Sequence, residues 1–206
     1  MSDEPDPPVV PDEQLRANGW ELVEESVETM AQLPAMQVRG TTLEYDDMRM
    51  RTALEEATDG ELSHRIRFFA ATRIGFRPQL PLGVSAAMVG AQIRSAATDK
   101  FIDRLEGNGL VDIDRQDSTR LRVDNGKRAR LKRFRAVDPF EGVEETLPLD
   151  CLIAIWTDGK EAMIVTTGYP AVSVAERTGI EDPDGILATS SETLREEVIS
   201  LLKAVE

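Results

Sequence analysis

The chain has 206 residues, 41% of them hydrophobic, which is enough to bury a sizeable core. It contains one cysteine and one histidine, which excludes an intrachain disulfide and the usual Cys/His zinc spacings. Its 38 acids against 24 bases, 19 of them arginine, give a net charge of −14. This balance is typical of a salt-adapted proteome, because at molar salt the Debye length is about 3 Å and an acidic surface stays soluble. We interpret the charge mainly as solvation and predict a halophilic, acidic protein.

The first eleven residues, MSDEPDPPVVP, are acidic and rich in proline, which predicts a disordered tail over 1–11. They contain neither a basic n-region nor an apolar h-region, so no signal peptide is indicated. The longest apolar stretch, residues 80–93, is interrupted by proline and glycine and is too short to span a bilayer. We therefore expect a cytoplasmic protein without membrane association. The composition has no internal break, which favours a single α+β domain over 12–206.

A short helix is expected at 12–17, followed by two strands near 20–30 and 36–45 with a turn at 33–35. Residues 20–30 also fit a helical stripe, so strand and helix both stay open there. Asp46 or Asp47 is then expected to cap a helix that runs to about Ala57 and ends at 58–60.

The clearest early strand is expected at 64–76, where apolar residues alternate with a face carrying Arg65, Arg67 and Arg73. After a turn at 77–81, a long helix is predicted from about Val84 to Glu106. Its expected buried positions are Met88, Ala91, Ala97, Phe101 and Leu105.

The segment 115–135 contains nine of the 24 basic residues and only two acids. Its net charge is +7, so the remaining 185 residues together carry −21. Asp124-Asn125-Gly126 lies between two runs of alternating residues, which indicates a β-hairpin.

The hydrophobic pattern fixes the register of this hairpin, because a slip of one residue reverses every side chain. A two-residue loop mixes apolar and charged residues on both faces. A three-residue loop with Gly126 left-handed pairs Leu121 with Ala129 and Arg122 with Arg128. That register places Leu121, Val123, Ala129 and Leu131 on one face, and Arg120, Arg122, Arg128 and Arg130 on the other. Like charges directly opposite each other are unfavourable, so the arginine face needs counter-anions.

A second hairpin is predicted from strands at 152–156 and 161–167 around Asp158-Gly159, and the continuously apolar run 151–156 indicates a strand covered on both faces. Residues 168–189 are expected to form a loop with several turns. A capping box at 189–192 predicts the start of a last helix. Its apolar stripe is Leu194, Val198, Leu201, Leu202 and Val205.

No residue pattern predicts catalysis or a cofactor. Cys151 opens an apolar strand and His64 precedes another, so we expect a buried structural cysteine and a strand-end histidine. The glycine-containing turns do not match phosphate-binding loops. Acidic pairs such as Asp46-Asp47 and Asp182/Asp184 lack EF-hand spacing, so no metal site is expected.

The arginine face is the one cluster that indicates binding, and its candidate partner-binding residues are Arg120, Arg122, Arg128, Arg130 and Lys132. Three interpretations stay open. Acids of the same chain, on the helix ending at Ala57 or on the C-terminal helix, neutralise the face. An acidic protein partner or a second copy docks on it. Nucleic acid binds it, with Phe134 or Phe69 stacking on a base; this is less favoured because phosphate binding weakens with salt.

The segments RFFAATRIGFRPQLPLGVS and LIAIWTDGKEAMIVTTGYP resemble a conserved family of haloarchaeal proteins. The order of the expected elements also distantly resembles the PsbP-like fold shared with the Ran-binding Mog proteins. That resemblance implies a curved antiparallel sheet packed by a long central helix and a C-terminal helix. It also implies a non-enzymatic binding or assembly factor, although no binding residue of that family can be matched to this sequence.

We therefore expect an α+β binding protein with the hairpin 115–135 as its docking surface. The alternative is an enzyme or sensor that binds an anionic small molecule. An enzyme would need a concave pocket where arginines converge with a carboxyl group of shifted pKa, whereas a docking module would show a flat or convex arginine face.

Overall fold

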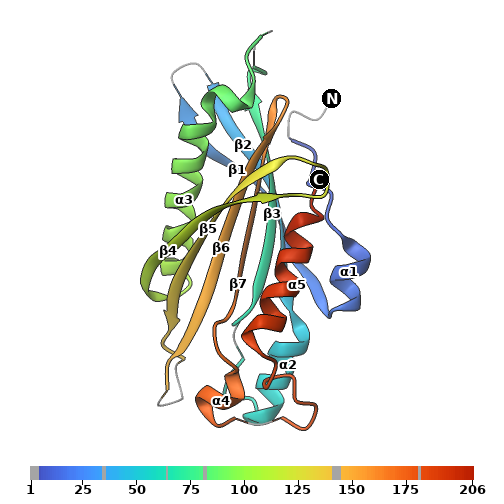
Figure 1. Cartoon of the computed structure of the whole chain (residues 1–206), viewed down its shortest axis with the longest axis vertical. Helices are drawn as coiled ribbons and strands as arrows, with labels where there is room; N and C mark the ends of the chain where they lie inside the picture. The colour runs from blue at the N-terminus through green and yellow to red at the C-terminus, as the bar shows by residue number, and fades with distance from the viewer. Residues whose placement is uncertain (1–4, 34–35, 64, 81–82, 141–144, 181) are drawn as a thin grey trace.

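The computed structural model describes residues 5–33, 36–63, 65–80, 83–140, 145–180 and 182–206. They form an α+β fold built on one seven-stranded antiparallel sheet, with strand order β1-β2-β3-β7-β6-β5-β4 (Figure 1). The strands are β1 (Trp20–Leu33), β2 (Met36–Asp47), β3 (Phe68–Arg77), β4 (Val111–Arg122), β5 (Arg128–Asp138), β6 (Leu147–Asp158) and β7 (Glu161–Pro170). The predicted fold class, an α+β protein with an antiparallel sheet made of hairpins, is confirmed.

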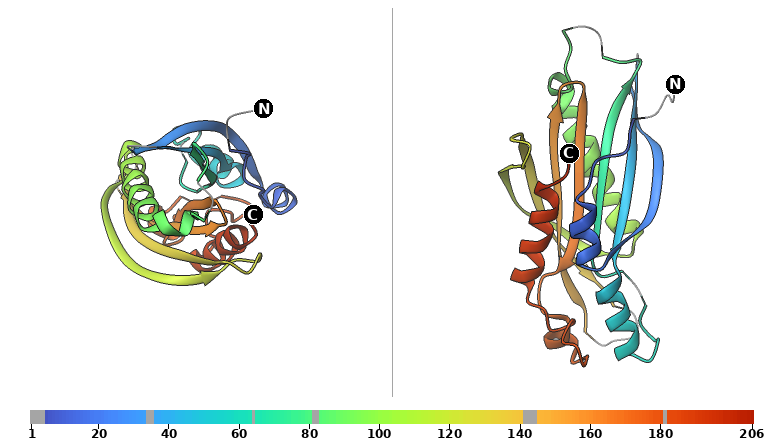
Figure 2. Two further views of the ribbon diagram at one scale, coloured as in Figure 1. Left: turned by 90° about the horizontal axis from the view of Figure 1, so that it is seen from above. Right: turned by 90° about the vertical axis from the view of Figure 1, so that its right-hand side faces the viewer.

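The helices are α1 (Asp12–Ala17), α2 (Met48–Ala57), the 3₁₀ turn η1 (Ala86–Val89), α3 (Gly90–Gly107), α4 (Val174–Thr178) and α5 (Ser191–Lys203). The sheet is curved, and α3 and α5 lie on its opposite sides (Figure 2). On its side, α3 contacts β1, β4 and β6, while α5 contacts β7. Ion pairs from Lys100 to Glu28 and from Arg104 to Glu44 join α3 to β1 and β2. The long helix therefore bridges strands near both edges of the curved sheet.

One apolar core fills both sides of the sheet. The run 151–156 of β6 is buried throughout, which confirms that this strand is covered on both faces. The predicted stripe of the C-terminal helix is buried as well: Leu194, Val198, Leu201, Leu202 and Val205 are at most 2% exposed. Its N-cap is Ser190, whose side chain accepts a hydrogen bond from the Thr193 amide, rather than the first residue of the predicted capping box.

The basic segment forms the predicted hairpin in the predicted register. Leu121 pairs with Ala129 and Arg122 with Arg128, and Gly126 has a φ of 85°. Val123, Ala129 and Leu131 are buried, whereas Arg120, Arg122, Arg128 and Arg130 are exposed. The hydrophobic pattern was sufficient for this prediction, because only this register places the apolar residues together.

The two N-terminal strands are also present. Between 20 and 30 the chain is strand β1 rather than helix, and it pairs with β2 from Trp20↔Asp47 onward. The expected turn at 33–35 falls partly outside the described residues. Asp47 caps α2 by accepting a hydrogen bond from the Met50 amide at 3.1 Å, and α2 ends at Ala57 as expected.

Several boundaries differ from the prediction. Strand β3 begins at Phe68 rather than at 64, and the residue before it, Arg67, is buried and forms an ion pair with Asp47. The predicted helix 84–106 is divided into η1 and α3, and its expected core residues Met88, in η1, and Ala91, in the first turn of α3, are exposed. The predicted loop 168–189 begins within β7, which continues to Pro170, and it contains the short helix α4, which its mixed composition did not indicate.

Residues 5–11 differ from the disordered tail that their composition predicts. Val9 exchanges two backbone hydrogen bonds with Glu206, at 2.8 and 2.9 Å, and the carbonyl of Pro5 accepts a hydrogen bond from Thr41. Pro8 is buried. The amide and carbonyl groups of this segment find partners in the fold, which composition alone does not reveal. Residues 1–4 lie outside the described residues.

Candidate functional site

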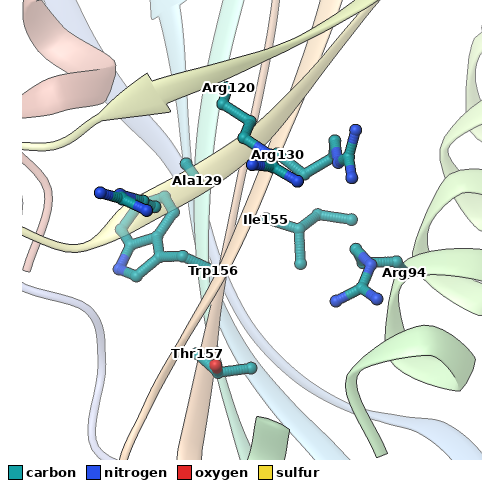
Figure 3. Close-up of a pocket in the computed structure, with 8 residues that line it drawn as sticks. Arg94, Arg120, Ala129, Arg130, Ile155, Trp156 and Thr157 are labelled. Atoms are coloured by element: carbon teal, nitrogen blue, oxygen red, sulfur yellow. The ribbon is translucent and has the colours of Figure 1, made fainter.

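The strongest candidate site is a pocket at the point where β5 separates from β6. The two strands pair only as far as Arg130↔Ile155. Beyond this pair the hairpin tip extends toward α5, where the Asp124 amide donates to the Lys203 carbonyl at 2.9 Å. The separation leaves a pocket of about 290 Å³ (Figure 3). Its walls are Arg94, Arg120, Arg128, Ala129, Arg130, Ile155, Trp156 and Thr157.

Four arginines from three different elements converge on this pocket. Arg94 comes from α3, Arg120 from β4, and Arg128 and Arg130 from β5. Arg94 reaches the pocket from the helix, on the side of Ile155 away from Trp156 in Figure 3. Three of the five predicted partner-binding residues are therefore brought together, and a fourth arginine joins them from a distant part of the sequence.

The charges of these four arginines are not compensated within the described part of the chain. None of them forms an ion pair there, and the described pocket wall contains no aspartate or glutamate. Neighbouring bases are different: Arg133 pairs with Asp117 at 2.8 Å, Arg135 with Asp150 at 2.9 Å, and Lys127 with Asp158 at 2.7 Å. Internal neutralisation thus accounts for part of the basic segment but not for the pocket, where the helix above the arginine face contributes Arg94 instead of an acid.

The other two predicted residues lie outside the pocket wall. Arg122 lies nearer the hairpin tip, and its Nε donates to the Gly126 carbonyl at 3.4 Å. Lys132 lies one strand repeat further along β5 and donates to Thr98 Oγ1 of α3 at 2.8 Å. Burial lowers the pKa of Lys132, and the positive charges of Arg115, Arg130 and Arg94 lower it further, against Asp99. The lysine therefore lies in a region where positive charges outnumber negative ones.

Arg65, Arg67 and Arg73 do not extend the arginine face. Strand β3 is separated from β5 by β7 and β6, so these residues belong to another region. Each is neutralised there: Arg65 pairs with Glu44 at 3.4 Å, Arg67 with Asp47 at 2.5 Å, and Arg73 with Glu161 at 3.8 Å. Sequence alone does not fix which strands are neighbours, so it left open whether these arginines extend the face of Arg120 and Arg130.

The aromatic side chains considered for base stacking are not accessible. Phe134 is 2% exposed and contacts Phe101 edge-to-face, and Phe69 is fully buried beside Trp20 and Tyr45. Trp156 lines the pocket but is 3% exposed, and its Nε1 has no hydrogen-bond partner among the described residues. Stacking on Phe134 or Phe69 is excluded in this structure, which weakens the nucleic-acid interpretation.

The remaining candidates for chemistry have structural positions. Cys151 is fully buried, and burial raises the pKa of its thiol to about 12, so it stays protonated at neutral pH. His64 lies outside the described residues. Within the described ranges, no group of three or more His, Cys, Asp or Glu side chains is arranged to hold a metal ion. None of the described helices is long and apolar enough to cross a membrane.

Comparison with protein families assigns the whole folded chain. Residues 7–206 match the family model DUF6517, a domain of unknown function. The chain belongs to this family. The match covers every helix and strand described above, including the elements that form the arginine pocket. A search of curated proteins found no match.

Arg94 and Trp156 are two of the pocket residues that the sequence did not indicate. Arg94 stands in an amphipathic helix where an arginine is ordinarily a solvated residue, and nothing local to it indicates the hairpin as its neighbour. Trp156 belongs to a continuously apolar strand and was expected only as core. Both depend on the contact between α3, β5 and β6, which is a tertiary feature.

The directly opposed pair Arg120↔Arg130 supports a prediction about stability. Replacing Arg120 by serine is expected to raise the melting temperature at low salt by about 1–2 °C, because like charges facing each other across a ladder repel. The gain should shrink as added salt screens the repulsion. Thermal unfolding at low and molar salt measures both effects. If Arg120→Ser lowers the melting temperature at low salt, Arg120 and Arg130 do not carry an uncompensated repulsion.

Proposed function

We propose that this DUF6517 protein is a non-enzymatic binding protein whose arginine pocket receives an anionic group. The observation that carries the proposal is the convergence of Arg94, Arg120, Arg128 and Arg130 on one pocket without an ion pair among the described residues. Maintaining opposed arginines costs stability, and arginine forks are suited to oxyanions, since they bind carboxylate and phosphate bidentately. A bound anion supplies the missing counter-charge.

The shape of the site favours an anion that enters a pocket over a flat docking surface. Ligand pockets are concave and present a few convergent polar groups, and the arginine pocket has this form. An enzyme of the alternative kind needs a carboxylate or another base beside the bound anion. The described wall offers arginine guanidinium groups and the hydroxyl of Thr157, which suit binding rather than proton transfer.

The setting of the proposed function follows from the sequence. The acidic surface and the preference for arginine over lysine support a halophilic, cytoplasmic protein of archaeal origin. The curved antiparallel sheet with α3 and α5 on opposite sides supports a resemblance to PsbP-like binding and assembly factors. An acidic protein partner is a second candidate for the bound anion, because Arg120, Arg128 and Arg130 are exposed at the pocket mouth.

The test compares two variants with equal loss of charge. Arg120→Ser/Arg130→Ser removes two pocket arginines, and the control Arg115→Ser/Arg122→Ser removes two arginines of β4 outside the pocket wall. Thermal unfolding is measured against increasing phosphate, sulfate, citrate and malonate at constant ionic strength. We expect a saturable stabilisation of the wild type and the control by at least one anion, with loss of that stabilisation in the pocket variant. Equal responses of all three proteins would refute anion binding at this site.

A further inference from the structure

We infer that the arginine pocket is a site for a condensed phosphate chain, that is, a diphosphate or triphosphate group. This inference rests on the proposed function and specifies its ligand. Three observations carry it: the number of hydrogen-bond donors, their spacing along the hairpin, and the polar character of the accessible wall.

The number of donors exceeds what a single small anion accepts. Each guanidinium carries five N–H donors and no acceptor. Four guanidiniums in one pocket therefore present about twenty donors and four positive charges. One carboxylate accepts at roughly four lone-pair sites and carries one charge. A diphosphate or triphosphate group carries several charges on many terminal oxygens, so it can engage most of these arginines at once.

The spacing of the arginines favours an elongated anion. Arg128 and Arg130 are two residues apart on β5, so their Cα atoms are separated by about 6.8 Å. Arg120 and Arg130 are opposed across the ladder, about 5 Å apart. Arg94 approaches from α3, on the other side of Ile155 from Trp156 (Figure 3). A chain of linked phosphates offers oxygens at several positions along such a row, whereas orthophosphate offers one centre.

The accessible wall is formed mostly by the arginines. Ala129, Ile155 and Trp156 are at most 4% exposed, so they close the pocket but leave little apolar or aromatic surface for a ligand. A nucleobase would therefore find no open stacking face inside the pocket. Single-stranded nucleic acid relies on such faces together with a basic groove that follows its backbone, so it fits this site less well than a short phosphate chain.

Anion binding is expected to relieve the repulsion between the positive side chains of the hairpin. Lys132, on the same face, already has its pKa lowered by burial and by Arg115, Arg130 and Arg94. A multivalent anion between the arginines removes repulsion that the free protein carries, so its binding should stabilise the fold in a concentration-dependent way. The source of the phosphate chain can be free pyrophosphate or tripolyphosphate, or the end of a nucleotide.

Calorimetric titration of the full chain, without divalent cations, tests the assignment. The probes are pyrophosphate, tripolyphosphate, ADP, ATP, orthophosphate and citrate, with a 20-nucleotide single-stranded DNA as the polymer. Pyrophosphate or tripolyphosphate is expected to bind at least roughly tenfold more tightly than orthophosphate or citrate, because more charge-assisted bonds form. Arg120→Ser/Arg130→Ser and Arg94→Ser should each weaken this binding at least about tenfold, and Arg115→Ser/Arg122→Ser by less than about threefold. Far-ultraviolet circular dichroism establishes that each variant is folded.

Every other outcome of the titrations either supports or refutes the phosphate-chain assignment. If ADP and pyrophosphate bind equally, the phosphate chain alone is recognised; if ADP binds more tightly, a nucleotide is the source. Both results support the assignment. If citrate binds most tightly and depends on the pocket arginines, the phosphate-chain assignment fails while anion binding at the site stands. If DNA binds most tightly and weakens equally in the pocket and control variants, the segment is a nucleic-acid surface and the assignment fails. If no probe depends on the pocket arginines, both the assignment and the proposed function fail.

Discussion

Replacing Arg67 by alanine is expected to lower the free energy of unfolding by about 3–5 kcal/mol, the effect of breaking a buried ion pair from one side. Arg67 is 1% exposed, the most deeply buried charged side chain among the described residues. Its Nη1 donates to Asp47 Oδ2 at 2.5 Å, its Nη2 lies 3.3 Å from Glu197 Oε2, and its guanidinium stacks 4.7 Å from the Trp20 ring centre. Alanine removes all three contacts and leaves the buried Asp47 with only the more distant Arg49, whose Nε lies 3.9 Å from Asp47 Oδ1.

The loss should spread beyond the ion pair, because Asp47 also caps α2 and Glu197 belongs to α5. Arg67 thus connects the start of one helix, the middle of another and the edge strand β1. Denaturant unfolding followed by circular dichroism measures the change. Arg177→Ala is the matched control, since its pair with Glu145 leaves both side chains about half exposed, and it should cost less than about 1 kcal/mol. A similar small change for both variants would show that Arg67 does not hold these elements together.

The hairpin of the basic segment could be predicted from sequence to the level of individual pairs. Its loop and alternation are local, and a wrong register would have placed Val123 and Ala129 in water. The same held for the cap of α2 and for the apolar stripe of α5, where short-range hydrogen bonds and helical periodicity decide the outcome. Local chemistry therefore determined which elements form.

The arrangement of those elements could not be predicted in the same way. Nothing in the alternation of 64–76 shows that two strands lie between β3 and β5, or that Arg67 lies before β3 and pairs with Asp47. For the same reason the sequence identified Arg120, Arg128 and Arg130 but not Arg94, whose role depends on α3 crossing the hairpin. The arginine cluster is visible in sequence as charge, and it becomes a pocket through tertiary packing.

Replacing Gly168 by alanine is expected to cost about 1–3 kcal/mol, the effect of overpacking a tightly packed site. Gly168 on β7 is directly opposite Phe68 on β3, and the phenyl ring lies over the glycine. A Cβ added at this position would lie within 2.8 Å of Phe68 Cζ and closer still to Cε1, so the ring must move. An aromatic ring that covers a glycine on the neighbouring strand supplies the packing that the glycine, having no side chain, cannot supply. We therefore expect substitutions of Phe68 and Gly168 to have non-additive effects on the free energy of unfolding.

A double-mutant cycle tests this coupling. Phe68→Leu removes the ring, so Gly168→Ala should cost much less in that background than in the wild type, with an interaction energy of about 0.5–3 kcal/mol. The control is Gly107→Ala at the end of α3, where an added Cβ meets no described atom within 4 Å, and alanine should be neutral or stabilising by up to about 1 kcal/mol. Additive effects of the two substitutions would mean that the strain at Gly168 comes from the backbone of β7 and not from the ring. Coupling, in contrast, would show that the strain comes from the contact of Phe68 with Gly168, in the pairing of β3 with β7 at the centre of the sheet.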